Sequence, residues 1–161
     1  MSKLSIICVD DQRDVLAALR KDLEEFRGVG EVVSCESADE TMDVLEDLSR
    51  HGKEAALLIC DHVMPGTNGV DFLARISSDL RFTRTKKILL TGLASHQDTI
   101  AAINRARIDY YIEKPWTREG LIAVVKRFLT QYVIEAGLDY TAYASVMDQD
   151  TLYRELHLKN R

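Results

Sequence analysis

The chain lacks long apolar runs. No stretch approaches the roughly 18 consecutive apolar residues of a membrane-spanning helix, and the first apolar run, which starts at Leu4, meets an acidic pair by Asp10. A secretory signal would need a longer apolar stretch and a cleavage site of small residues. Cysteine is also scarce, and its three occurrences are Cys8, Cys35 and Cys60. This odd number, without the spacing of a zinc site, predicts buried thiols in a reducing compartment and no disulfide framework. We therefore expect a cytoplasmic protein.

Positive charge is in deficit. The chain has 21 Lys and Arg residues against 26 Asp and Glu residues, which gives a net charge of −5 at pH 7. A nucleic-acid-binding surface that covers the whole protein is therefore not expected. The 161 residues, 46% of them hydrophobic, are enough for one domain with its own core and a short appendage.

Short apolar runs alternate with longer amphipathic segments. Strands are predicted at residues 4–9, 31–35, 55–60, 87–91 and 110–112. The second run is mixed in character and suits a sheet edge. The other four are nearly continuous in apolar residues, which is typical of strands buried on both faces of a parallel sheet.

Apolar residues recur at helical spacing between these runs. The stripes are Val15, Leu19, Leu23 and Phe26; Met42, Leu45 and Leu48; Leu73, Ile76 and Leu80; Ile100 and Ile103; and Leu121, Val125, Phe128 and Tyr132. Ser37, Ser95 and Thr117 are predicted to cap three of these helices. Five strand–helix repeats predict an α/β fold, a doubly wound five-stranded parallel sheet with helices on both faces. In such folds ligands bind at the carboxyl ends of the strands.

Those strand ends carry reactive side chains. Asp10 and Asp11 follow the first strand, Asp61 the third, Thr91 ends the fourth and Lys114 follows the fifth. Carboxylates gathered at one edge repel each other, and a divalent cation with oxygen ligands, such as Mg²⁺, relieves the conflict. An aspartate beside such a cation, a lysine and a hydroxyl can act as a nucleophile toward a phosphoryl group.

Four segments together resemble a known family. They are residues 6–11 (IICVDD), 57–69 (LLICDHVMPGTNG), 88–92 (ILLTG) and 110–115 (YYIEKP). In this order and at these separations, they are similar to the receiver domains of two-component response regulators, over about residues 3–128. The resemblance implies a flavodoxin-like strand order of 2-1-3-4-5. It also implies a phosphoprotein of signal transduction, which accepts a phosphoryl group from the phosphohistidine of a histidine kinase and is not an enzyme on separate substrates.

The resemblance implies a role for each residue of the acceptor site. Asp61 resembles the phospho-acceptor. Asp10 and Asp11 resemble the acidic pair that holds Mg²⁺, with the backbone carbonyl of Val63 as a further ligand. Val63 and Leu93 are apolar where some receivers carry polar residues, which predicts slow loss of the phosphoryl group.

The resemblance also implies a switch. Thr91 resembles the hydroxyl that moves onto the phosphoryl group, and Tyr111 the aromatic whose rotamer follows it. Lys114 resembles the family's lysine, and Pro115 a proline that often follows a cis peptide. His62, next to the acceptor, is interpreted as a loop residue.

Two other aspartate- or phosphate-binding folds fit less well. A flavodoxin needs a phosphate loop rich in Ser, Thr and Gly after the first strand, where this chain has Asp10 and Asp11. A hydrolase of the haloacid dehalogenase kind carries a second Asp two residues after its nucleophile, where this chain has Val63.

Residues 129–161 form a predicted helical extension. The fifth helix is expected to continue to a cap at Gly137, and a second apolar stripe follows, formed by Leu138, Tyr140, Tyr143, Val146 and Met147. This extension could fold back on its own receiver, form a homodimer, or lead to an output domain. The fourth helix–fifth strand–fifth helix face is another candidate dimer surface. Acidic residues outnumber basic ones in the tail, so DNA binding is not expected. An alternative function is a phosphate-independent scaffold that acts through this tail.

Overall fold

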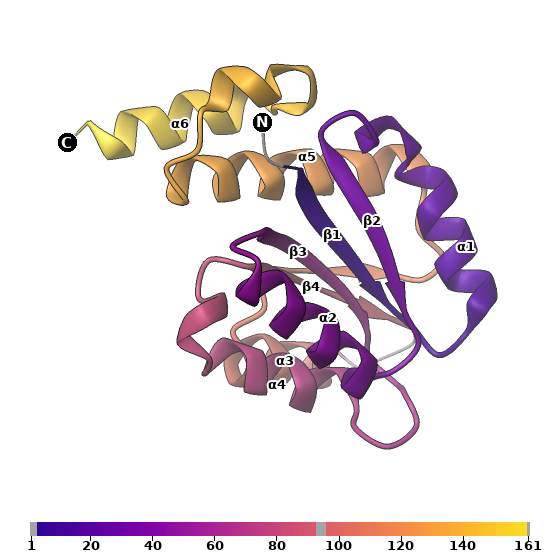
Figure 1. Ribbon diagram of the computed structural model, residues 1–161. Helices are drawn as coiled ribbons and strands as arrows, with labels where there is room; N and C mark the ends of the chain where they lie inside the picture. Colours follow the sequence, from indigo (N-terminus) through magenta and orange to yellow (C-terminus); the bar gives the residue numbers. More distant parts are fainter. Residues whose placement is uncertain (1–2, 93–95, 161) are drawn as a thin grey trace.

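The computed structural model describes residues 3–92 and 96–160. Its centre is a parallel sheet with the strand order β2-β1-β3-β4-β5 (Figure 1). The strands are β1 (Leu4–Val9), β2 (Gly30–Cys35), β3 (Glu54–Asp61), β4 (Lys86–Thr91) and β5 (Tyr110–Glu113). The predicted fold class and strand order are confirmed.

Helices cover both faces of the sheet. The α-helices are α1 (Arg13–Asp22), α2 (Ala38–Arg50), α3 (Gly69–Ser77), α4 (His96–Ala106), α5 (Arg118–Glu135) and α6 (Gln149–Lys159). Short 3₁₀ helices occur at η1 (Glu24–Phe26), η2 (Leu80–Phe82) and η3 (Tyr140–Val146). One hydrophobic core joins the sheet to α1 and α5, and a second joins it to α2, α3 and the end of α4.

Two details of the predicted stripes are wrong. The first stripe is not one helix, because α1 ends at Asp22 and Phe26 enters the core from η1. Leu80 is not on a buried face: its side chain is 88% exposed. The reason is local, since α3 ends at Ser77 and the carboxylate of Asp79 accepts a hydrogen bond from Arg81 N, which starts a new turn.

The sheet edges explain a third difference. β2 lies at one edge, as its mixed sequence predicted, but β5 lies at the other. Tyr110 on β5 is consequently 40% exposed, so burial on both faces was wrong for this strand.

The predicted helix caps are confirmed where the structure describes them. Ser37 Oγ accepts from Glu40 N at 3.1 Å, and Thr117 Oγ1 accepts from Gly120 N at 3.1 Å. Ser95, the third predicted cap, lies outside the described residues. These caps set the starts of α2 and α5, the helices that follow β2 and β5.

The C-terminal extension folds back on the α/β domain that precedes it. α5 ends at Glu135, and Gly137, at φ 72°, lets Leu138 N donate to Val133 O at 3.0 Å. The chain then passes through η3 and returns as α6, which lies along α5 (Figure 1). Three side chains of this return enter the same core as α1 and α5; they are Tyr143, Val146 and Met147. Of the arrangements predicted for this tail, folding back on the domain of its own chain is the one that the structure shows.

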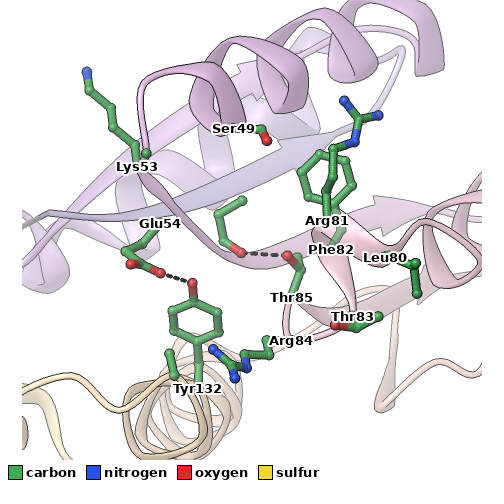
Figure 2. Close-up of a pocket in the computed structure, with 13 residues that line it drawn as sticks. Ser49, Lys53, Glu54, Leu80, Arg81, Phe82, Thr83, Arg84, Thr85 and Tyr132 are labelled. Carbon is green, nitrogen blue, oxygen red and sulfur yellow. Dashed lines mark hydrogen bonds between the residues drawn. The ribbon is translucent and has the colours of Figure 1, made fainter.

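Polar contacts fix the extension at the amino-terminal end of the sheet. The hydroxyl of Tyr132 donates to Glu54 Oε2 at the start of β3, as Figure 2 shows. Lys86, at the start of β4, donates to Glu135 at 2.8 Å. Of these residues, Glu54 and Tyr132 line a cleft of about 460 Å³, which lies between the end of α5, the start of β3 and η2.

Candidate functional site

The carboxyl ends of β1 and β3 bring three aspartates together. Asp10 follows β1 and is fully buried, Asp61 is the last residue of β3 and is 7% exposed, and Asp11 is exposed in the turn. Each offers a carboxylate oxygen, and these oxygens all lie within 4.8 Å of one another. The convergence follows from the parallel sheet, in which β1 and β3 are direct neighbours.

Lys114 reaches this cluster from the end of β5. Its Nζ donates to Asp61 Oδ1 at 2.7 Å and to Asp10 Oδ2 at 3.1 Å. The bond from Lys114 to Pro115 is a cis peptide. Burial works against the charged lysine, but the hydrogen bonds to both aspartates outweigh it, and the pKa of Lys114 lies above its usual value.

The charges do not balance. Burial raises the pKa of Asp61; the hydrogen bond from Lys114 opposes this, and the neighbouring charges of Asp10 and Asp11 add to it. Three carboxylates share one ammonium group, so part of their negative charge is not compensated. Several carboxylate oxygens at this separation fit a hard divalent cation such as Mg²⁺. Asp10, Asp11 and Asp61 are the residues that could hold it.

Thr91 closes the site on the side of β4. Its side chain is 2% exposed, and it follows Leu90, the residue that pairs with Asp61 across the two strands. Thr91 Oγ1 lies 3.5 Å from the Nδ1 atom of His62. The predicted pair of Thr91 and Lys114 is also linked through the backbone, because Lys114 N donates to Thr91 O at 2.7 Å.

The two remaining predicted residues lie beside this group. Val63 is in the loop after Asp61 with its side chain 75% exposed, so any ligand from it is the main-chain carbonyl. Tyr111 is half-buried on β5, packs against the core of α2, α3 and α4, and stacks on Tyr110 with ring centroids 6.2 Å apart. Leu93, part of the lifetime prediction, lies outside the described residues.

Sequence reasoning gave no role to Gly69. A Cβ atom at this position would lie 1.9 Å from the carbonyl oxygen of Asp61, so the start of α3 can approach Asp61 this closely only with glycine there. Gly69 N donates to His62 O at 3.0 Å, and Asn68 caps the helix by accepting from Asp71 N at 2.8 Å. The signal was present in the Asn68–Gly69 pair, a cap followed by the residue without a side chain.

The cysteines are buried, as predicted. Burial raises the pKa of Cys8 to about 12 and that of Cys35 to about 11. Cys60, next to Asp61 in the sequence, is also buried, and its pKa is raised by burial and by the charges of Asp61 and Asp10. All three thiols therefore stay protonated near neutral pH, and a protonated thiol is a poor nucleophile.

Within the described residues, no helix is both long and apolar enough to cross a membrane.

Comparisons with known proteins agree with this arrangement. The hydrogenase transcriptional regulatory protein HoxA of Cupriavidus necator is 35% identical over 124 residues, which cover 76% of this chain and 23% of that protein. Chemotaxis protein CheY1 of Helicobacter pylori (strain ATCC 700392 / 26695) is 27% identical over 118 residues, 73% of this chain and 90% of that protein. A CheY-like response regulator receiver domain protein from Methanospirillum hungatei JF-1 superposes with a TM-score of 0.68 at 27% identity, covering 83% of this chain and 99% of that structure.

The length of the match differs among these relatives. The chain spans about a quarter of the length of the two HoxA proteins, 23% in one and 27% in the other. The family model described as the response regulator receiver domain matches residues 6–126. The sheet order, the acidic cluster and this match lead to one conclusion: the chain belongs to the response regulator receiver family of two-component systems.

Proposed function

We propose that this receiver accepts a phosphoryl group on Asp61 in the presence of Mg²⁺. The observation that carries the proposal is the convergence of Asp10, Asp11, Asp61 and Lys114 at one edge of the sheet. A phosphohistidine of a histidine kinase is the proposed donor, and acetyl phosphate is a small-molecule substitute for it.

In the proposed site, the acidic residues share the binding of one cation. Asp10, Asp11 and the main-chain carbonyl of Val63 hold the cation together with Asp61. When bound, Mg²⁺ supplies positive charge that offsets the charge of the phosphoryl oxygens. Asp10 is already oriented, because its Oδ1 accepts from Gln12 N at 2.8 Å and its Oδ2 accepts from Lys114.

The transfer is a nucleophilic substitution at phosphorus. A carboxylate oxygen of Asp61 forms the new O–P bond while the N–P bond of the phosphohistidine breaks, and the bonding electrons leave with the imidazole, which takes up a proton. The Lys114 ammonium group, now 2.7 Å from Asp61, is positioned to pair with a phosphoryl oxygen. Each chain accepts one phosphoryl group on its own aspartate and does not turn over a separate substrate. We therefore class it as a signalling protein and not as an enzyme.

The proposed output is a change of shape away from Asp61. Thr91 would turn its hydroxyl toward the phosphoryl group. The side chain of Tyr111 on β5 would then change its rotamer in response. The face of α4, β5 and α5 then binds a partner or a second copy in a phosphorylation-dependent manner. This face already presents Tyr110, with Arg127 over its ring at 6.0 Å from the centroid.

We further propose residues 3–128 as the receiver proper and 129–161 as its helical extension. This boundary falls inside α5, so the extension continues a receiver helix before it returns over it. The names of the HoxA relatives describe transcriptional regulation, and an output domain or protein of that kind is the proposed downstream partner.

Intact-protein mass after incubation with acetyl phosphate tests the proposal. We expect one phosphoryl adduct in the wild type with Mg²⁺, and none without Mg²⁺ or in Asp61→Asn. An adduct that persists in Asp61→Asn would place the acceptor elsewhere. Absence of an adduct with both acetyl phosphate and a phosphorylated kinase would reject the function.

A further inference from the structure

We propose that His62 is a positioning residue that holds the Thr91 hydroxyl in its resting place. The proposal rests on the proposed function, because it concerns the movement of Thr91 toward a phosphoryl group on Asp61. Its starting observation is the 3.5 Å contact between His62 Nδ1 and Thr91 Oγ1.

The Thr91 side chain needs a hydrogen-bond partner in this position. It is 2% exposed, so water has little access to it, and a buried hydroxyl without a partner is costly. Within the described part of the chain, the imidazole of His62 is the partner that the structure gives it. Loss of the ring nitrogen therefore weakens the resting position of the hydroxyl.

The backbones on both sides of the contact are fixed. His62 N donates to Leu90 O at 2.8 Å, and His62 O accepts from Gly69 N at 3.0 Å, so the residue is held between β4 and the start of α3. Thr91 is held by its place in β4, which pairs with Glu113 of β5, and its carbonyl accepts from Lys114 N. The two side chains consequently meet because the fold aims them at each other.

The contact must break when the hydroxyl engages a phosphoryl oxygen on Asp61. An interaction present in the resting state and absent in the transition state slows the step, because it lowers the energy of the starting state alone. His62 thus opposes activation, because its hydrogen bond stabilises the resting position of the Thr91 hydroxyl and acts as a brake on its movement. One modest hydrogen bond limits the size of this brake.

Two variants separate the ring nitrogen from the ring shape. His62→Phe keeps an aromatic ring and removes the polar atom. His62→Asn removes the ring but places an amide oxygen or nitrogen the same number of bonds from the backbone as Nδ1, so it can accept or donate. We expect His62→Phe to be phosphorylated by acetyl phosphate about two- to fivefold faster than the wild type, and His62→Asn to resemble the wild type.

The same pair is then measured in a Thr91→Val background. If the imidazole acts through the hydroxyl, His62→Phe has no accelerating effect there, and the difference between backgrounds is the coupling of the two residues. Equal rates for all three residues at position 62, or the same acceleration in the Thr91→Val background, would overturn the proposal.

Nuclear magnetic resonance of the His62 ring gives a readout without phosphorylation. With the ring neutral and no phosphodonor present, Thr91→Val should shift the Nδ1 resonance, because it removes the hydroxyl. An unchanged resonance overturns the pairing even if the position-62 variants fail to fold. If the wild type shows no Mg²⁺-dependent adduct, the proposed function fails while this resonance still decides whether His62 and Thr91 are joined.

Discussion

The two ends of the sheet differ in how well their charged and polar groups are compensated. At the carboxyl end, the carboxylates of Asp10, Asp11 and Asp61 lie close together, and Lys114 is their cationic partner. At the amino end, polar groups are matched one to one: Tyr132 with Glu54, Lys86 with Glu135, and Thr85 with the carbonyl of Ala55. One end therefore leaves negative charge uncompensated, at the place where we propose that a cation and a phosphoryl group bind, while the polar groups of the other end pair with one another and hold the tail in place.

The closing end extends into the tail. Thr130 on α5 is fully buried; its hydroxyl donates to Lys126 O at 2.7 Å and accepts from Asp148 N at 2.9 Å, just before α6. Lys159 near the end of α6 donates to Ile134 O at 3.4 Å. The return segment is therefore fixed to α5 near both ends of α6, which suits a stabilising role independent of the aspartate cluster.

The largest expected effect is a loss of stability when the packing of the tail at the amino end of the sheet is disrupted. Tyr143→Ala removes a ring that is 3% exposed in the core shared with α5, and we expect a loss of about 3 kcal/mol of unfolding free energy in urea. Tyr140→Ala, at a ring that is 37% exposed, is the matched control and should cost much less. Phosphorylation per folded molecule should not change in either variant. A lost adduct in folded Tyr143→Ala would show that the two ends are not independent.

The second effect concerns the unbalanced end. Mg²⁺ should stabilise the folded protein, because the acidic cluster exists only when the strand ends are assembled. At a concentration one hundred times the Kd, ligand binding adds about 2.7 kcal/mol, visible as a rise in Tm by calorimetry. Asp61→Asn should show a smaller rise. Equal rises in both proteins would mean that the ion binds elsewhere.

The third prediction uses the same end without metal. The folded state raises the pKa of Asp61, so the charged carboxylate costs stability at neutral pH, and that cost falls as the pH drops through the folded pKa. Asp61→Asn should therefore be more stable than the wild type in metal-free buffer at pH 7, by about 1 kcal/mol. The gain should shrink toward pH 4. A less stable Asp61→Asn at pH 7 would contradict the imbalance.

The same comparison shows what the sequence could predict. Asp10, Asp61, Thr91 and Lys114 were predictable, because strand ends of a parallel sheet meet at one edge whatever the loops do. The 3.5 Å contact of His62 was not, since it depends on side-chain direction in a loop.

The tail and the short turns show the limit of periodicity. A helical stripe says that Tyr143 and Val146 need a partner, but it does not say which surface provides it. Leu80 continued a stripe by spacing alone, while the cap at Asp79 had already turned the chain outward. Local hydrogen bonds of this kind override hydrophobic spacing over a few residues.

The last expected effect is local and concerns the start of α6 in the tail. Asp148 caps α6 by accepting from Thr151 N at 3.0 Å, and the hydrogen bond from the Thr151 side chain, against a small effect of burial, is the main cause that holds its pKa below the usual value. A lowered pKa contributes stability above the ordinary aspartate pKa and loses it as the pH falls through the folded one. The cap contributes about 1 kcal/mol to the stability of α6, so Asp148→Ala should speed amide hydrogen exchange in α6 at pH 7. The same change should also remove the increase of this exchange at acid pH.

Asp148→Asn is the control, because it retains a capping oxygen without a titrating charge. In this variant α6 should stay protected from exchange, and its exchange should no longer depend on protonation at position 148. If acid loosened α6 equally in the wild type and in Asp148→Asn, the pH response of the tail would belong to another group, and the closed end of the sheet would owe nothing to this charge.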